Sequence, residues 1–147
     1  GQARPARDKR MDLSKGFRRL QEIMGRDFTP VFTPPWNRCD GESMEAMPAI
    51  GIKGLSRTVG AGPNPPAVLP DFPVRMDLHT RKEPAPEASL TAMLGEMEEG
   101  LSSGSLGIML HHQRMNQAAL GFLATLLAEL SARKGVAFAH FAGLLKG

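Results

Sequence analysis

The sequence predicts an α/β fold in which about five parallel strands alternate with helices. Short runs rich in β-branched and apolar residues alternate along the chain with longer segments in which apolar residues recur every three or four positions. One short run, residues 106–110, is apolar except for its glycine, which is typical of a parallel strand buried on both faces. This alternation favours an α/β layer or a barrel with parallel strands.

The first predicted helix follows a basic and irregular lead-in, residues 1–11. Asp12 is a residue type that caps the start of a helix, and Gly25 is one that ends a helix. The apolar residues between them recur on one helical face; they are Leu13, Phe17, Leu20 and Met24. We therefore expect a helix from Asp12 to Gly25.

Two strands and a short helix are expected next. Residues 29–35 combine β-branched and aromatic residues with prolines, which predicts a strand at the edge of a sheet. A short helix over residues 42–49 and a second strand over residues 51–56 follow. Residues 57–73 form a long loop rich in glycine and proline, and loops of this length inside compact domains tend to be lids or binding loops.

The second half of the chain predicts three more strands, each followed by a helix. The expected strands are residues 74–79, 106–110 and 136–139, and the expected helices begin at Pro86, Asn116 and Phe141. Proline suits the first turn of a helix, asparagine suits the N-cap, and Gly135 marks the end of the middle helix. We expect residues 1–147 to form a single domain.

The composition excludes several classes of protein. With 147 residues, the chain is too short for a complete eight-stranded α/β barrel, which takes about 250 residues. An apolar share of 41% and a charged share of 22% are ordinary for a globular domain, and every apolar run is too short to cross a membrane. The lone cysteine, Cys39, excludes a disulfide within the chain and is expected to be buried or inert.

The net charge of +3 does not predict a nucleic-acid partner, since much of the excess lies near the N-terminus. The chain has one tryptophan, no tyrosine and no recognisable nucleic-acid-binding module. We expect neither a nucleic acid nor a membrane as partner. Residues 1–10 lack the apolar core of a signal peptide. The sequence does not predict a cellular compartment, and we take the cytoplasm as the default expectation.

Reactive or recognition residues directly follow, or end, four of the predicted strands. They are Trp36, Asn37 and Arg38 for the first strand, Arg57 for the second, Asp77 and His79 for the third, and His111 and His112 for the fourth. In parallel α/β folds the carboxyl ends of the strands share one rim, where ligands bind. We therefore expect these residues to converge on one pocket.

Asp77 and His79 are two residues apart, so on a strand their side chains point to the same side, where the carboxylate would orient the imidazole. The same spacing also fits two residues at an exposed strand end that have no functional role, and spacing alone slightly favours that interpretation. Because side chains alternate along a strand, only one of His111 and His112 can face the pocket. Asp77, His79 and His111 together would make a metal site of two histidines and one carboxylate, which is a further hypothesis.

Common motifs for dinucleotide binding, phosphate binding, zinc proteolysis and serine hydrolysis are absent. Three segments together resemble the polysaccharide deacetylases of carbohydrate esterase family 4, the nodulation-type deacetylases. Residues 33–38 (TPPWNR) resemble the third motif of that family, a proline-proline-aromatic strand end, and residues 76–79 (MDLH) lie where the fourth, aspartate-bearing motif is expected. Residues 108–111 (IMLH) resemble the fifth motif, an apolar strand that ends on histidine, and residues 140–145 resemble the last helix.

This resemblance implies a partial (β/α) barrel, the C-terminal part of a seven-stranded deacetylase-type barrel, that acts on a polysaccharide or another acetylated glycan. In that family a divalent metal such as zinc binds the water and the acetyl oxygen, and an aspartate is the base. The resemblance implies that His111 is the acid that protonates the departing amine and that Asp77 orients it. The residues expected to bind substrate are Trp36, which would line the acetyl pocket, Pro35, Arg38 and His79.

The chain also departs from the family pattern. The first motif, a consecutive Asp-Asp, is absent, and so are the paired histidines of the second, since no H-x(3–5)-H occurs. Gly1 stands just after the point where the second motif would end, and Phe32 stands at the arginine position of the third. We therefore expect a metal-dependent glycan deacetylase domain that is incomplete or inactive as this chain and does not bind its metal alone. The alternative is a non-catalytic carbohydrate-binding or scaffolding module on the same fold.

An incomplete barrel would leave sheet edges with unpaired backbone donors, and such edges invite association. We therefore expect a homodimer, or another partner, that covers an open sheet edge.

Overall fold

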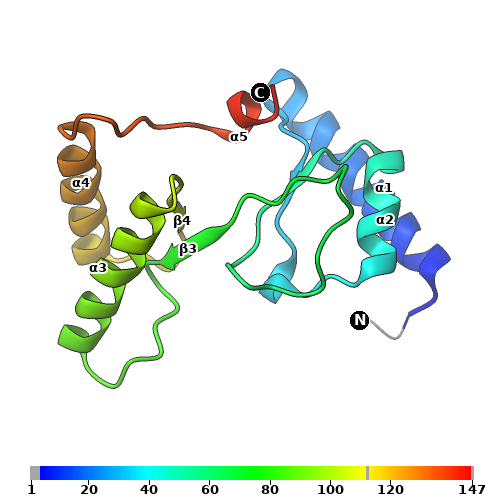
Figure 1. Cartoon of the computed structure of the whole chain (residues 1–147). Helices are drawn as coiled ribbons and strands as arrows, with labels where there is room; N and C mark the ends of the chain where they lie inside the picture. The colour runs from blue at the N-terminus through cyan, green and yellow to red at the C-terminus, as the bar shows by residue number, and fades with distance from the viewer. Residues whose placement is uncertain (1–3, 112, 147) are drawn as a thin grey trace. The chain divides into compact units, whose positions relative to one another are not determined.

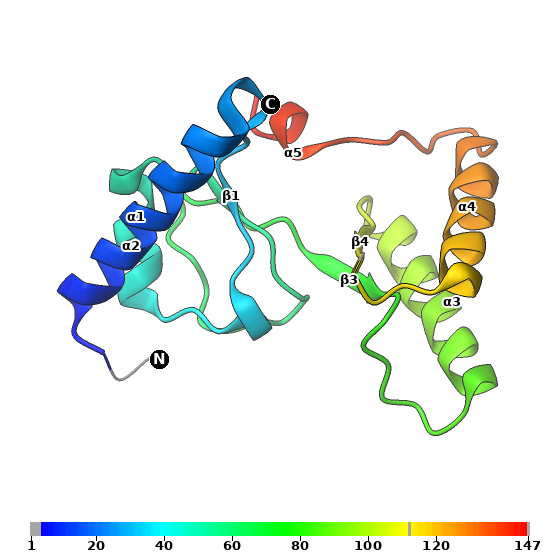
Figure 2. The ribbon, with the colours of Figure 1, turned by 180° about the vertical axis from the view of Figure 1, so that it is seen from behind.

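The computed structural model describes residues 4–111 and 113–146. The chain divides into two compact units: unit 1 comprises Gly1–Pro73 and Phe141–Gly147, and unit 2 comprises Val74–His140. Figures 1 and 2 show that each unit combines helices with one small sheet. The fold is mixed α/β, as predicted, with five α-helices and two parallel two-stranded sheets among the described residues.

Unit 1 is built around one parallel pair of very short strands. Its elements are α1 (Ala6–Met24), η1 (Gly25–Asp27), β1 (Val31–Phe32), η2 (Pro35–Asn37), α2 (Gly41–Ile50), β2 (Gly54–Leu55) and α5 (Phe141–Leu144). β1 pairs with β2, and Val31 lies opposite Gly54. β1 is shorter than predicted because Pro30 and Pro34 flank it, and proline has no N–H to donate to a sheet.

The first helix begins earlier than the sequence predicts. α1 starts at Ala6, so the prediction of an irregular lead-in over residues 1–11 was wrong for its second half, and Asp12 lies inside the helix instead of capping it. Residues 6–11 contain neither glycine nor proline, so nothing in them ends a helix. The predicted end was right: the C-cap is Gly25, whose φ of 53° favours glycine.

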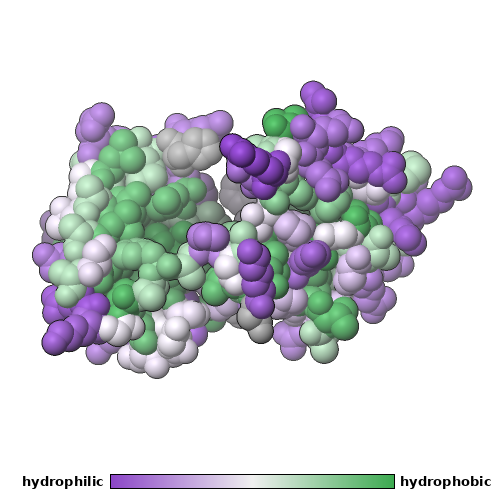
Figure 3. All heavy atoms as spheres, turned by 90° about the horizontal axis from the view of Figure 1, so that it is seen from above, coloured by the Kyte–Doolittle hydropathy of each residue, from purple (hydrophilic) through white to green (hydrophobic). Residues whose placement is uncertain are grey.

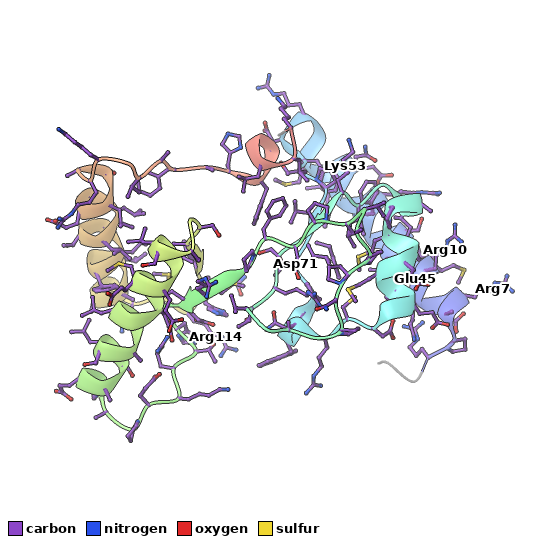
Figure 4. All side chains as sticks on the ribbon, viewed as in Figure 1. Arg7, Arg10, Glu45, Lys53, Asp71 and Arg114 are labelled. Atoms are coloured by element: carbon purple, nitrogen blue, oxygen red, sulfur yellow. The ribbon has the colours of Figure 1, made fainter. Side chains whose placement is uncertain are left out.

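Tertiary contacts explain why this basic segment is ordered. Lys9 Nζ donates to Asp40 Oδ2 at 2.7 Å and to Glu42 Oε2 at 3.3 Å, so the first turns of α1 are tied to the start of α2. The neighbouring Arg7 and Arg10 are exposed and point away from unit 1 (Figure 4). One cation of the segment is therefore structural, whereas its neighbours face solvent.

The core of unit 1 lies between the helices and the loop that follows β2. Its buried apolar residues are Cys39, Met44, Met47, Ile52, Leu55 and Leu69. The α1 residues Leu13 and Phe17 pack against this core, and the ring of Phe17 meets Phe28 edge to face at a centroid distance of 5.1 Å. Cys39 is buried as predicted, and desolvation raises the pKa of its thiol, which makes it less reactive.

Unit 2 contains the second parallel pair, with one helix after each strand. Its elements are β3 (Val74–Asp77), α3 (Pro86–Ser102), β4 (Gly107–Met109) and α4 (Gln117–Ser131). Asp77 lies opposite Met109, and a bulge lies between Val74 and Met76. Both predicted helix starts are confirmed, because Pro86 is the first residue of α3 and Asn116 Oδ1 accepts a hydrogen bond from Ala119 N–H at 2.9 Å.

One glycine sets how closely α3 approaches the turn that leads into β4. Gly100 is buried, and a Cβ at this position would lie 2.7 Å from Leu106 Cδ1 and 3.2 Å from Arg75 Cδ. A methyl group fits at these distances only if the Leu106 and Arg75 side chains move, so glycine permits the closest approach here.

The sheets are smaller than the sequence suggests. The prediction of a strand over residues 136–139 was wrong, because this segment is extended without a strand partner, and Phe138 is exposed. β4 is only partly buried, so the expectation of a strand covered on both faces was also wrong. Four of the expected strands are present, in two separate sheets, and the described residues form no closed barrel. The loop over residues 57–73 is irregular, as predicted, apart from single bridges.

Unit 2 exposes a large apolar surface for its size. Figure 3 shows a broad hydrophobic area in the left part of the view, which holds unit 2. The exposed large apolar residues of this unit are Leu90, Leu94, Leu101, Leu110, Leu120, Leu127 and Phe138. A search of the described residues found no helix that combines the length and the apolar character needed to span a bilayer.

The cap and ion pair of Asp40 give a first test of this fold. Asp40 Oδ1 accepts from Ser43 N–H at 2.9 Å, and the hydrogen bond from Lys9, followed by those from Ser43, lowers the Asp40 pKa to about 2. We expect Asp40→Ala to lower the free energy of unfolding by about 1–2 kcal/mol, and Asp40→Asn, which keeps the cap, by less than about 1 kcal/mol. Urea denaturation followed by circular dichroism measures both values.

The pH dependence separates the ion pair from the cap. Since the folded pKa of Asp40 lies below its ordinary value of 3.8, its contribution is complete above that pH and is lost as the pH falls toward 2. The difference in stability between the wild type and Asp40→Asn should therefore narrow from pH 7 to pH 2. A difference that stays constant would show that the charge of Asp40 does not stabilise unit 1.

Candidate functional site

The structure brings together an aspartate and a histidine that lie 34 positions apart in the chain. Asp77 is the last residue of β3, and His111 follows β4 by two residues. The strands are parallel neighbours with Asp77 opposite Met109, so both side chains lie at the carboxyl end of the sheet. His111 Nε2 lies 3.1 Å from Asp77 Oδ2, which is hydrogen-bond distance.

The Asp77 carboxylate is held on both of its oxygens. Oδ1 accepts from the backbone N–H of His79 at 2.8 Å and of Thr80 at 2.9 Å, and Oδ2 faces the His111 ring. Partial burial acts to raise the pKa of Asp77, but the hydrogen bonds from Thr80, His79 and His111 outweigh it and lower the pKa below 3.8. At neutral pH the carboxylate is therefore ionised and fixed in orientation, and it can orient and stabilise a protonated imidazole.

His79 lies beside the pair, but for a different reason from the one the sequence suggests. β3 ends at Asp77, so the alternation of a strand no longer applies at His79. The Asp77 carboxylate contacts the backbone of His79, and the ring of His79 lies against the ring of His111 at a centroid distance of 5.2 Å. His79 therefore holds Asp77 through its N–H and places an exposed imidazole next to His111.

The surroundings of His111 are polar. A cavity of about 190 Å³ is lined by Leu110, His111, Gln113 and Arg114. When Nε2 of His111 is bonded to Asp77, Nδ1 is the ring nitrogen left to deliver or accept a proton. His112, the other member of the histidine pair, lies outside the described residues.

Arg81 anchors the turn that carries Asp77 and His79. Its guanidinium binds Glu96 of α3 through two nitrogens at 2.8 and 2.9 Å, and it binds Glu83 at 2.7 and 3.1 Å. Nη1 also lies 3.3 Å from the backbone oxygen of Asp77. The turn between β3 and α3 is thus tied both to the helix and to the end of the strand.

Sequence reasoning missed Arg81. The carboxylate two positions on, at Glu83, is a local signal, but charged residues are common in such loops. The decisive partner, Glu96, lies in the middle of α3, and only the packing of α3 on β3 brings it to Arg81. No spacing rule in the sequence predicts this contact.

The described residues do not fit a divalent metal. No group of three or more histidine, cysteine, aspartate or glutamate side chains among them is arranged to hold one. Asp77 Oδ2 and His111 Nε2, 3.1 Å apart, are within hydrogen-bond distance of each other. The hypothesis of a metal site made of Asp77, His79 and His111 therefore lacks support among the described residues.

The residues expected to bind substrate at the first strand lie in unit 1. Pro35, Trp36 and Arg38 are exposed, and the indole of Trp36 is 84% accessible. Trp36 and Asn37 both have a positive φ, of 57° and 56°. Trp36 therefore does not pack between a helix and a sheet of unit 1.

Arg57, singled out because it follows the second strand, is buried. It is 1% exposed, and it donates from Nε to Asp71 Oδ2 at 2.8 Å and from Nη1 to the backbone oxygen of Pro63 at 3.0 Å. Asp71 points inward in Figure 4. Arg57 thus ties the loop after β2 to its own far end instead of facing a ligand.

The structure therefore groups the expected site residues into two sets. Asp77, His79 and His111 belong to unit 2, and Pro35, Trp36 and Arg38 belong to unit 1. The convergence of both sets on one pocket stays a prediction.

Comparisons of the chain with protein-family models, with curated proteins and with solved structures gave no match. The function must therefore be argued from the residues and their geometry.

The role of Arg81 can be tested with a matched arginine. We expect Arg81→Gln to lower the free energy of unfolding by about 1–3 kcal/mol, since it leaves two partly buried carboxylates without their cation. Arg133→Gln, which removes an exposed pair with Glu129, should cost less than about 0.5 kcal/mol. Hydrogen exchange at the His79 and Thr80 amides should become faster in Arg81→Gln alone. Equal effects of the two substitutions would contradict the assignment.

The hydrogen bond between Asp77 and His111 can be tested by titration of the carboxyl carbon in NMR spectra. In the wild type the Asp77 midpoint should lie below 3.8. His111→Phe keeps a ring of similar size but removes Nε2, so the midpoint should rise while the bonds from His79 and Thr80 keep part of the depression. His140→Phe, at an exposed position of the same unit, is the control and should leave the midpoint unchanged.

Proposed function

We propose that this chain is a deacetylase-type hydrolase domain that acts on an acetylated glycan, and that it is incomplete as a catalyst by itself. The single observation that supports this most is the contact between Asp77 Oδ2 and His111 Nε2 at the carboxyl ends of adjacent parallel strands. The resemblance of the sequence to polysaccharide deacetylases assigns an acid and its orienting carboxylate to these same two residues.

In this proposal His111 delivers a proton to the departing amine when the bond from nitrogen to the acetyl carbon breaks. The Asp77 carboxylate receives hydrogen bonds from His79 and Thr80, so it stays in place and stays ionised while the imidazole gives up its proton. The proton leaves from Nδ1, because Nε2 faces Asp77. Activation of the attacking water falls to groups that the described residues do not provide.

Trp36 supplies the second part of the proposal. An indole that is 84% exposed offers one face to a pyranose ring, whose C–H groups stack on aromatic surfaces. Pro35 and Arg38 flank it on the exposed turn and would contact the neighbouring hydroxyl or acetyl groups. In this proposal Pro35, Trp36 and Arg38 bind the glycan.

The finer fold prediction belongs to the same proposal. Both sheets are parallel, and a helix follows β1, β3 and β4, whereas an irregular loop leads from β2 to β3. Apart from this loop, strands and helices alternate as expected for the C-terminal part of a (β/α) deacetylase barrel. We propose that each strand pair, taken by itself, corresponds to two adjacent strands of such a barrel.

A second candidate function is a carbohydrate-binding or scaffolding module without catalysis. The observations that favour it are the misfit of the described residues to a metal and the absence of the Asp-Asp and paired-histidine motifs. The same Trp36 would then act in binding alone. The two candidates differ in acetate release and agree in glycan binding.

Calorimetric titration with an N-acetylchitooligosaccharide and with its deacetylated counterpart tests the proposal. We expect the acetylated oligomer to bind more tightly, and we expect Trp36→Ala to weaken that binding about tenfold, since stacking is lost. Phe138→Ala, an exposed aromatic residue of unit 2, is the matched control and should leave binding unchanged. Failure to bind either oligomer would overturn both candidates, whereas equal affinity for the two would show that the acetyl groups are not recognised and would overturn the deacetylase.

Acetate release, measured with and without added zinc, then separates hydrolase from module. We expect no release by this chain alone, because it lacks the residues that activate water in the family it resembles. If the wild type releases acetate with zinc and His111→Ala does not, the chain is complete as a catalyst. This result would overturn the proposal that it is incomplete by itself. Release that survives His111→Ala would remove His111 from the mechanism.

A further inference from the structure

Two consecutive residues of unit 1 adopt a backbone conformation that their side chains disfavour. Trp36 has φ 57° and ψ 25°, and Asn37 has φ 56°. For residues other than glycine the left-handed region costs roughly 1–2 kcal/mol per residue, and a bulky residue such as tryptophan rarely occupies it. The surroundings must therefore hold this turn in place.

The side chain of Asn37 is the main tether of the turn. Its Oδ1 accepts from the backbone N–H of Thr58 at 2.9 Å, and its Nδ2 donates to Thr58 Oγ1 at 2.9 Å. This amide therefore makes both of its contacts to one residue 21 positions away. Asparagine is also among the residues that best tolerate a positive φ, so the residue type fits both demands.

Thr58 is itself fixed by the core of unit 1. It follows Arg57, which is 1% exposed and binds Asp71 Oδ2 from Nε at 2.8 Å and from Nη2 at 2.7 Å. A third bond, from Arg57 Nη1 to the backbone oxygen of Pro63, closes the loop after β2. Asn37 is thus tethered to a residue whose neighbour in the chain, Arg57, is buried and held by hydrogen bonds at both Asp71 and Pro63.

The residue that gains from this arrangement is Trp36. Within unit 1 its indole is not used for packing, since it is 84% exposed. A strained backbone that presents an exposed aromatic face destabilises the folded protein. It also restricts the motion of the indole before a ligand binds, so less conformational entropy is lost on binding. The arrangement therefore suits a stacking surface for a sugar ring.

We propose that Asn37, through its two hydrogen bonds to Thr58, is the positioning residue that holds Trp36 in its outward-facing, stacking orientation. The part of this inference that concerns a sugar ring rests on the proposed function, whereas the tether itself does not. Asn37 acts through Trp36 and is not expected to touch the ligand.

The composition of the chain makes the tether directly measurable. Trp36 is the only tryptophan and there is no tyrosine, so the ultraviolet fluorescence of the protein reports on Trp36 alone. Time-resolved anisotropy separates the fast local motion of the indole from the tumbling of the protein. In the wild type we expect little fast motion; in Asn37→Ala we expect a clearly larger fast component.

A conservative variant and a control separate the tether from general stability. In Asn37→Asp the carboxylate still accepts from Thr58 N–H, and the Thr58 hydroxyl can donate to it, so wild-type anisotropy should return. Asn37→Gly accepts the positive φ without strain but has no side chain, so it should show the same larger fast component. This variant replaces Asn37→Ala in the test if the alanine variant does not fold. Asn64→Ala, at an exposed asparagine of the same unit, should behave as wild type.

Titration with an N-acetylchitooligosaccharide completes the experiment. We expect Asn37→Ala and Asn37→Gly to bind about three- to tenfold more weakly than wild type, and Asn37→Asp to bind as wild type, because only the loss of order at Trp36 is penalised. If the indole stays ordered in Asn37→Gly, Asn37 is not the residue that positions Trp36, and the result of the oligosaccharide titration does not change this conclusion. If the indole loosens as expected but no form of the chain binds the oligosaccharide, the tether stands and the proposed glycan function falls.

Discussion

The candidate site depends on the register in which β3 pairs with β4. Parallel pairing places Asp77 opposite Met109, and this alone brings Asp77 within hydrogen-bond distance of a histidine two residues beyond β4. A shift by one residue would turn the Asp77 side chain to the other face of the sheet. The short strands are therefore less important for their own stability than for the alignment of the residues that follow them.

Local signals in the sequence predicted three helix ends correctly, whereas Asp12 lies inside α1 and α4 ends at Ser131, before Gly135. Gly25 ends α1, Pro86 opens α3 and Asn116 caps α4, and each of these assignments depends only on the backbone demands of one position. The pairing of Asp77 with His111 also follows from the expectation that strand ends share a rim. In each of these cases the residue type is constrained by its immediate neighbours or by the geometry of parallel strands.

Contacts between distant segments decided the rest, and no spacing rule contains them. α1 begins at Ala6 where its first turns meet α2 through Lys9, and residues 136–139 have no strand to pair with. Arg81 remained unnoticed because its partner on α3 comes near only through packing. Asn37 was noticed as a polar residue at a strand end, but its two bonds to Thr58 arise from the folding of the intervening loop.

Gly100 lies on the same helix as a residue that helps to fix the candidate site. Glu96 lies one helical turn before Gly100 on α3 and binds Arg81. Arg81 also contacts the backbone oxygen of Asp77 and so restrains the segment that follows β3. A Cβ at position 100 would meet Leu106 Cδ1 at 2.7 Å, so a larger residue requires a shift of the Leu106 side chain or of α3. A position outside the candidate site thereby influences the helix that helps to fix the Asp77 carboxylate on the neighbouring strand.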